Sequence, residues 1–178
     1  MNRSESSARS RAAALVTRLA LVLATVLTGT LVVPRPAAAA TGYFGALTLC
    51  TQSSCVNKGN VVLFWQRRLW ADEGYDDPDG VFGPNTEAAT IHWQQLYNAA
   101  NSPDIDVDGW VGSETWEASN LNTVWGYRWT STDSTYFYYT YQGRISGRTF
   151  YIRERRSDRV TWFRMPGVST WTDTSYVY

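Results

Sequence analysis

The sequence predicts an α+β protein in which a small three-helix bundle is followed by a small antiparallel β-sheet unit. Three segments in the first part carry apolar residues at helical spacing. Residues 122–178 instead alternate aromatic and polar residues between short turn sequences, which is typical of antiparallel strands. The charge changes near the same place, because residues 41–120 have a net charge of −8 and residues 121–178 a net charge of +4.

Residues 1–40 have the composition of a secretory signal peptide. Arginines precede an apolar run from Leu19 to Val33, and small residues lead up to Ala40. We expect cleavage near Ala40, which gives a secreted protein, extracellular or associated with the cell wall, without membrane attachment. The alternative is a retained membrane anchor, which the shortness of the run disfavours.

The N-terminal segment 41–56 contains both cysteines of the chain, Cys50 and Cys55. In an exported protein an even pair predicts a disulfide. A metal or redox role is the alternative, and it is disfavoured because no second cysteine pair or histidine cluster accompanies them.

Three helices are expected, over residues 60–73, 84–100 and 113–121. Gly74 is suited to end the first helix, because glycine favours the position after a helix C-terminus. Pro84 is suited to begin the second helix, where its missing N–H is harmless. Ser113 can cap the third.

An eight-residue motif occurs twice and marks two loop-to-helix corners. Its copies are Asp79-Gly80-Val81-Phe82-Gly83-Pro84-Asn85-Thr86 and, 29 residues later, Asp108-Gly109-Trp110-Val111-Gly112-Ser113-Glu114-Thr115. Each Asp-Gly pair predicts a tight turn with glycine at positive φ. We therefore interpret the shared positions as structural: Asp79, Gly80, Gly83, Asp108, Gly109 and Gly112.

These residues resemble the three-helix peptidoglycan-binding domain, a module attached to bacterial and phage cell-wall hydrolases. The resemblance covers about residues 57–121 and is carried by Trp65-Gln66-Arg67-Arg68-Leu69, Gly74-Tyr75, both motif copies and Trp93-Gln94. The chain departs from the family at Trp65, where Leu is usual, at Trp93, where Phe is usual, and at Thr90, where an aliphatic residue is usual. Residues 99–106 replace a short connection.

The resemblance implies a peptidoglycan-binding-like domain over 57–121, whereas the β-rich unit over 122–178 resembles no family and is expected from its residue pattern alone. The resemblance also implies a secreted, non-catalytic protein that binds the stem peptide or the glycan of peptidoglycan and needs no cofactor. Aromatic residues supply apolar contact in shallow grooves. The candidate ligand-binding residues are Tyr75, Phe82, Trp93 and Trp110.

Catalysis and metal binding are not expected. His92 is the only histidine, too few for the usual zinc sites, and paired cysteines would leave no thiol nucleophile. Residues 104–109 match the start of an EF-hand loop, but the position of its bidentate acid is occupied by Thr115. A pair of carboxylates could still cleave glycosides, so a small glycosidase stays as an alternative.

Two further questions are left open by the sequence. Strands are expected over 125–130, 135–142, 148–153 and 159–165. Their aromatic face either packs on the helices or forms an exposed face that stacks sugars, with Arg153, Arg155, Arg156 and Arg159 nearby. A protein partner is the other possibility that the sequence leaves open, since the chain could be an accessory or inhibitory protein that binds a secreted protein. Nucleic acid is not an expected partner, because the larger part of the mature chain, residues 41–120, is acidic and carries no basic helix.

Overall fold

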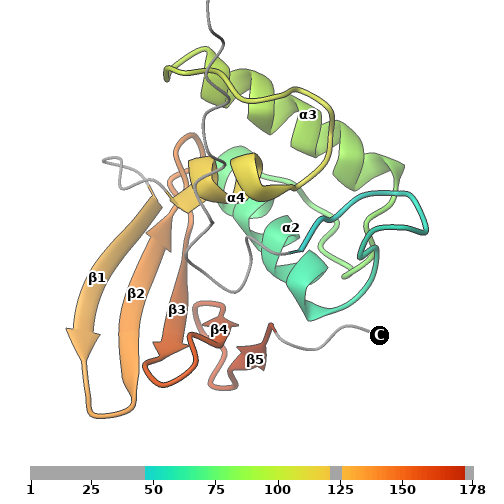
Figure 1. The fold of residues 1–178 in the computed structure, drawn as a ribbon. Coiled ribbons are helices and arrows are strands. Elements are labelled where there is room, and N and C mark those ends of the chain that lie inside the picture. Colours follow the sequence, from blue (N-terminus) through green and yellow to red (C-terminus); the bar gives the residue numbers. More distant parts are fainter. Residues whose placement is uncertain (1–46, 121–125, 175–178) are drawn as a thin grey trace, which may run out of the picture. The chain divides into compact units, whose positions relative to one another are not determined.

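The computed structural model describes residues 47–120 and 126–174, so the predicted signal peptide, 1–40, lies outside the described residues. The described chain forms three helices followed by five strands (Figure 1). They are α2 (Asn60–Glu73), α3 (Pro84–Asn98), α4 (Ser113–Asn120), β1 (Gly126–Thr132), β2 (Tyr136–Gln142), β3 (Thr149–Arg155), β4 (Thr161–Arg164) and β5 (Thr172–Asp173). The protein is therefore α+β.

The helix boundaries follow from local stereochemistry. Gly74 ends α2 with a left-handed φ of 85°, and its N–H donates to the Trp70 carbonyl while the next N–H, of Tyr75, donates to the Leu69 carbonyl. Pro84 is the first residue of α3. These predicted boundaries are confirmed, and α3 ends two residues earlier than expected.

The first motif copy is organised around a buried glutamine of α2. The Gln66 Nε2 atom lies 2.9 Å from Asp79 Oδ1, 3.0 Å from the Val81 carbonyl oxygen and 3.0 Å from Thr86 Oγ1. Its Oε1 atom accepts the Gly80 N–H at 2.7 Å. One side chain of α2 thus holds both the turn and the start of α3.

The second copy repeats this arrangement around Gln94 of α3. The Gln94 Nε2 atom lies 3.1 Å from Asp108 Oδ1, 2.9 Å from the Trp110 carbonyl oxygen and 3.1 Å from Thr115 Oγ1, and Oε1 accepts the Gly109 N–H at 2.9 Å. Gly109 has a φ of 77°, close to the 79° of the equivalent glycine. The expected positive-φ turns are confirmed.

A cluster of tryptophans fills the space between the helices. The Trp65 ring lies 5.3 Å from the Trp93 ring and 5.5 Å from the Trp116 ring, both edge-on. The Trp65 indole N–H donates to Thr90 Oγ1 at 2.9 Å. Trp65 and Thr90 are two positions at which the chain departs from the family pattern, and each depends on the other. The buried indole N–H of Trp65 needs a hydrogen-bond acceptor, which an aliphatic residue at position 90 would not supply.

The strands form one antiparallel sheet in the sequential order β1-β2-β3-β4-β5, as expected from the short connections. Tyr141 pairs with Phe150, and Ile152 pairs with Phe163. Because alternate residues of a strand point to opposite faces, these four side chains share one buried face. The two-residue strand β5 was not predicted, because so short a segment carries no periodic pattern.

The predicted three-helix bundle, separate from a following sheet unit, is wrong. Phe64 of α2 lies 6.0 Å from the Phe150 ring and 5.6 Å from the Phe163 ring, and one hydrophobic core includes residues of the helices and of the sheet. Helix α2 has two buried faces. The stripe of Val62, Trp65 and Leu69 is accompanied by a second stripe that packs on the strands.

The short disulfide segment is attached to the second motif copy. Cys50 and Cys55 form the expected disulfide, with their Cα atoms 5.5 Å apart. The neighbouring Leu49 exchanges two backbone hydrogen bonds with Val111, at 3.2 and 3.0 Å. Within the parts of the chain that the structure describes, no helix is long and apolar enough to cross a membrane.

Replacing Gln94 with alanine should destabilise the protein by about 2–4 kcal/mol, because the buried Gly109 N–H would lose its acceptor and a cavity would form. The neighbouring Gln95 is exposed, so Gln95→Ala is the matched control and should stay within about 0.5 kcal/mol of wild type. Urea denaturation of both variants measures the difference. Equal stability of the two would contradict a stabilising role for the buried amide.

Candidate functional site

A cavity of about 250 Å³ lies where the C-terminal ends of α2 and α3 approach strand β2 and the turn that follows it. Its lining includes Asp72, Trp93, Leu96, Tyr97, Tyr141 and Arg144. These residues come from four separate segments of the chain, so the cavity exists only because the helices pack on the sheet.

Two aromatic residues one turn apart on α3 form one wall of the cavity. The rings of Trp93 and Tyr97 are stacked, with centroids 5.7 Å apart and planes 20° from parallel. Trp93 is 8% exposed, whereas Tyr97 is half-buried. Spacing of four residues places both side chains on the same face of the helix, so Tyr97 is the part of the pair that is more accessible.

The floor of the cavity is organised by the carboxylate of Asp72, which is 5% exposed. Its Oδ2 atom accepts hydrogen bonds from the Trp93 indole N–H and the Tyr141 hydroxyl, both at 2.8 Å. Its Oδ1 atom accepts the Arg144 backbone N–H at 3.1 Å. Asp72 therefore joins α2 to α3, to β2 and to the turn after β2.

A buried arginine balances this buried carboxylate. Arg68 is 1% exposed, and its guanidinium carbon lies 4.8 Å from the centre of the Tyr141 ring and 5.0 Å from that of Tyr127. It also donates to the backbone carbonyl of Ser119. Arg68 precedes Asp72 by one helical turn, so the two opposite charges lie on the same face of α2.

The electrostatics of the floor follow mainly from burial. Burial raises the pKa of Asp72, while the Tyr141 hydroxyl, the charge of Arg68 and the Trp93 N–H oppose that rise. Burial and the neighbouring carboxylate raise the pKa of Tyr141 well above its ordinary value. The tyrosine hydroxyl consequently stays protonated near neutral pH and acts as a donor to Asp72.

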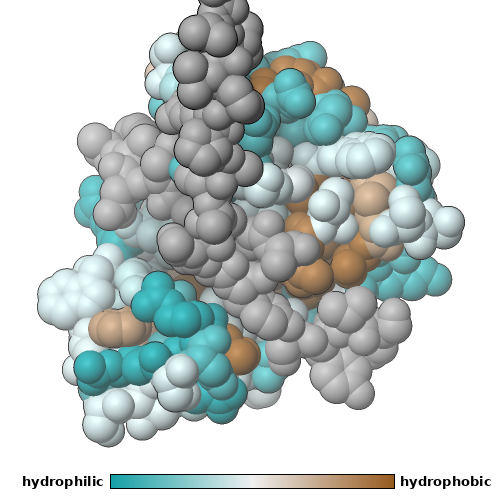
Figure 2. Space-filling view, in the orientation of Figure 1, coloured by the Kyte–Doolittle hydropathy of each residue, from teal (hydrophilic) through white to brown (hydrophobic). Residues whose placement is uncertain are grey.

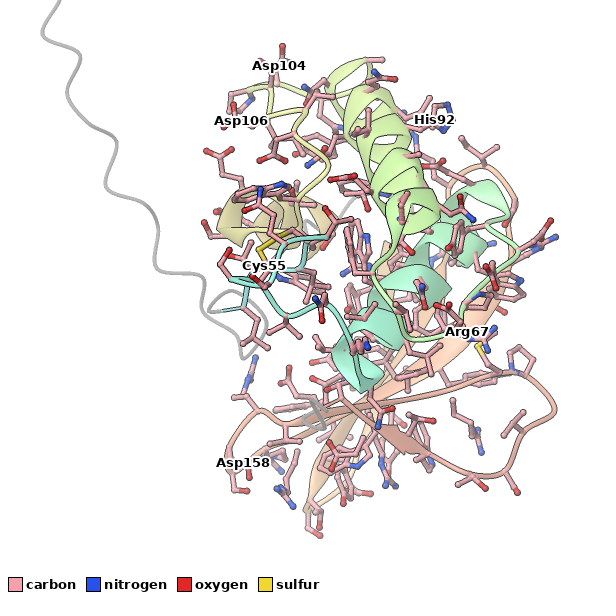
Figure 3. The ribbon with its side chains drawn as sticks, turned by 90° about the vertical axis from the view of Figure 1, so that its right-hand side faces the viewer. Cys55, Arg67, His92, Asp104, Asp106 and Asp158 are labelled. Atoms are coloured by element: carbon pink, nitrogen blue, oxygen red, sulfur yellow. A yellow bond between two sulfur atoms is a disulfide. The ribbon has the colours of Figure 1, made fainter. Side chains whose placement is uncertain are left out.

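The rim of the cavity carries groups of both charges. Glu73 Oε2 lies 2.5 Å from His92 Nδ1, and burial raises the pKa of Glu73 while this hydrogen bond opposes the rise. His92 lies along α3 with its side chain turned outward (Figure 3). Arg144 also lines the cavity, and its Nη1 atom lies 3.5 Å from the Leu96 carbonyl oxygen.

The four candidate ligand-binding residues predicted from the sequence lie in different parts of the structure. Trp93 lines the cavity, whereas Phe82 is 2% exposed and belongs to the core. Tyr75 is half-buried beside the first motif copy, with its hydroxyl 3.0 Å from Thr86 Oγ1. Trp110 is half-buried in the second copy. Only Trp93 of these four therefore contributes to the cavity.

The aspartates of the EF-hand-like segment are arranged for a turn. Asp104 and Asp106 lie on the loop beyond α3 (Figure 3), and both are exposed. Asp108 Oδ1 accepts the Trp110 N–H at 2.8 Å, the same contact that Asp79 makes with the Val81 N–H. Across residues 47–120 and 126–174, no group of three or more His, Cys, Asp or Glu residues is placed to hold a metal ion.

Comparison with known proteins found no matching family model, no matching curated protein and no matching solved structure. The interpretation of the cavity therefore rests on its own residues and on the motif resemblance.

Proposed function

We propose that this chain is a secreted, non-catalytic protein that binds bacterial cell-wall peptidoglycan, and that the cavity beside Asp72 is its binding site. The observation that carries this proposal is the stacked Trp93–Tyr97 pair on the cavity wall. Aromatic faces provide flat apolar surface for sugar rings and for the apolar parts of peptides, while a few polar groups set orientation.

The repeated motif supports the same function. Both copies use the residue set of the peptidoglycan-binding family, and in both a buried glutamine bonds the Asp, Gly and Thr positions. The chain does not form the expected separate three-helix bundle. The proposal therefore depends on the residues of the two motif copies and on the cavity. Helix α3 links the two features, because it carries Gln94 as well as the aromatic wall.

The volume and the charged residues of the cavity limit the kinds of ligand that it can hold. A volume of about 250 Å³ lies below the roughly 300–1,000 Å³ of common small-molecule pockets. It suits one sugar ring or one or two amino-acid side chains. Glu73 and Arg144 provide opposite charges at the rim, and a stem peptide carries both ammonium and carboxylate groups. The proposed contact is therefore with a single unit of the polymer.

Retention on purified wall sacculi tests this function. The wild-type protein should sediment with insoluble peptidoglycan, and Tyr97→Ala should weaken retention by about fivefold or more, because a half-buried stacking ring contributes about 1 kcal/mol or more to binding. Trp129 is 64% exposed on β1, so Trp129→Ala is the control with a comparable aromatic loss. Thermal melts of both variants separate lost binding from lost folding.

Three outcomes would change the interpretation. Wild-type protein that stays in the supernatant at low and moderate salt contradicts wall binding and favours a secreted protein partner. Loss of retention in Trp110→Ala but not in Tyr97→Ala moves the site to the second motif copy. Release of reducing sugar ends from the sacculi contradicts a non-catalytic role and favours the glycosidase alternative.

A further inference from the structure

The face of the sheet that points away from α2 carries arginines between aromatic rings. Strand alternation and register place aromatic and arginine side chains on this outer sheet face, among them Tyr136, Tyr138, Tyr151, Arg153, Trp162 and Arg164, with Asp173 of β5 opposite Trp162 at its edge. Arg153 pairs with Tyr138 on one side and with Trp162 on the other, and Arg164 pairs with Tyr151. Each arginine thus has an aromatic residue as its cross-strand neighbour.

The two guanidinium groups lie over ring faces. The Arg153 guanidinium carbon is 4.5 Å from the centre of the Tyr136 ring, 5.2 Å from that of Trp162 and 4.7 Å from that of Trp171. Such contacts hold the planar group in place. An arginine ordered in this way loses less conformational freedom when it binds a ligand.

The second arginine continues the pattern along the same face. The Arg164 guanidinium carbon lies 5.0 Å from the Tyr151 ring centre and 4.9 Å from that of Trp171. Trp171 therefore touches both arginines and connects them. Tyr151 is 37% exposed, so part of this aromatic surface is open to solvent.

These two charges have no acidic partner within the described part of the chain. Arg155 pairs with Asp158 at 2.6 Å, and Arg159 pairs with Glu154 at 2.8 Å. Among residues 47–120 and 126–174, none of the ion pairs includes Arg153 or Arg164. The Nε atom of each is itself buried and lacks a hydrogen-bond partner there, so a carboxylate would meet the terminal nitrogens of these half-buried side chains. In the view of Figure 2 the surface over the strands is mainly teal and near-white, as polar and aromatic residues would colour it.

We propose that the outer sheet face binds an acidic polysaccharide, whose sugar rings stack on the aromatic side chains and whose carboxylates accept hydrogen bonds from Arg153 and Arg164. Charge complementarity favours a polyanion, since residues 126–174 carry eight basic and four acidic side chains. Alternating rings and guanidinium groups match a polymer that alternates sugar faces with carboxylates. This surface is separate from the cavity, and the proposal does not depend on peptidoglycan binding.

Single-stranded nucleic acid is the other polymer that combines stacking rings with negative charge. The disulfide between Cys50 and Cys55 favours the polysaccharide, because disulfides persist in oxidising, exported compartments. The experiment therefore includes nucleic acid as a competing ligand.

Calorimetric titration of the purified protein with oligogalacturonate, at low salt, tests the proposal. The acidic oligomer should bind and its fully methyl-esterified counterpart should not, because esterification keeps the sugar rings and removes the charges. Arg153→Gln and Arg164→Gln should each weaken binding about tenfold, as expected for loss of one hydrogen bond to a charged group. Added salt should weaken binding to wild type.

Arg148→Gln is the matched control, because it removes the same charge from an arginine that lies over Trp70 of α2 and should leave binding unchanged. A thermal melt shows whether Arg153→Gln or Arg164→Gln is unfolded. If one of them is, the binding affinity of the other tests the proposal. The proposal is overturned if wild type does not bind the acidic oligomer, if Arg148→Gln weakens binding as much as the test variants, or if an oligothymidylate binds more tightly at the same salt.

Discussion

Replacing Gly143 with alanine should cause a loss of stability of about 3 kcal/mol or more, enough to unfold a marginally stable protein. A Cβ atom at this position would lie 1.6 Å from the Ala71 carbonyl oxygen, 2.0 Å from the Ala71 carbonyl carbon and 2.7 Å from the Asp72 nitrogen. All three are backbone atoms of α2 and cannot rotate away. The turn after β2 would therefore have to separate from the helix.

That separation would also break hydrogen bonds that close the cavity. The N–H groups of Ile145 and Ser146 both donate to the Asp72 carbonyl oxygen, each at 3.1 Å. Urea denaturation of Gly143→Ala measures the loss. Gly83→Ala is the control, because no atom lies within 4 Å of its added Cβ and its φ is −96°. Similar stability of the two variants would contradict close packing of the turn on α2.

Asp72→Ala should destabilise the protein by about 3–5 kcal/mol, because it leaves the buried charge of Arg68 without its partner. It also removes the acceptor of Trp93, Tyr141 and the Arg144 N–H. Guanidinium denaturation would follow the change. Asp76→Ala is the control, since Asp76 is exposed just beyond α2 and its loss should have little effect.

A double variant tests the coupling directly. Arg68→Met combined with Asp72→Asn removes both charges and should cost less than the sum of the two single changes, because neither charge is then buried alone. Additive losses of stability would show that the arginine and the carboxylate act independently. They would contradict the inference that Arg68 balances the buried charge of Asp72.

Local features of the chain could be predicted because they depend on nearby residues. Gly74 and Pro84 each have a stereochemical reason to end or begin a helix, and the helices α2, α3 and α4 have the expected starts. Ser113 is the first residue of α4 and not its cap, because the Gly112 carbonyl accepts the Trp116 N–H. The strands and their sequential antiparallel order follow from alternation and short connections. The Asp-Gly turns follow from the conformational freedom of glycine.

The residues through which the helices pack on the sheet could not be predicted in the same way. Phe64 and Arg68 flank the recognised apolar stripe of α2, and their partners, Phe150 and Tyr141, lie more than seventy residues further along the chain. Periodicity shows that a face is apolar but does not show what covers it. Packing of the aromatic strand face on the helices was one of the two interpretations left open, but the residues of α2 that cover this face could not be identified from the sequence.

Of the residues that line the cavity, only Trp93 was among the candidate ligand-binding residues. Tyr97 follows Trp93 by one helical turn and therefore shares a face with it in the predicted helix, yet the sequence does not show that the pair borders an open space. Asp72 and Arg144 were missed as site residues. The available signal was the Arg68–Asp72 spacing of one helical turn beside apolar residues, which is typical of a partnered charge pair. The gap between the predicted strands 135–142 and 148–153 places Gly143 in a turn, but its contact with Ala71 is long-range.

The two glutamine networks have a consequence for how the chain can be lengthened. Gln66 is 13 residues from Asp79, whereas Gln94 is 14 residues from Asp108, and both pairs end in the same arrangement. Each connecting loop is thus held at its two ends, so its interior length has little influence on the helices. Inserting residues into an anchored surface loop costs little entropy. The exposed stretch 102–104 is therefore a suitable place to graft a foreign peptide, with the anchoring amide of Gln94 kept intact.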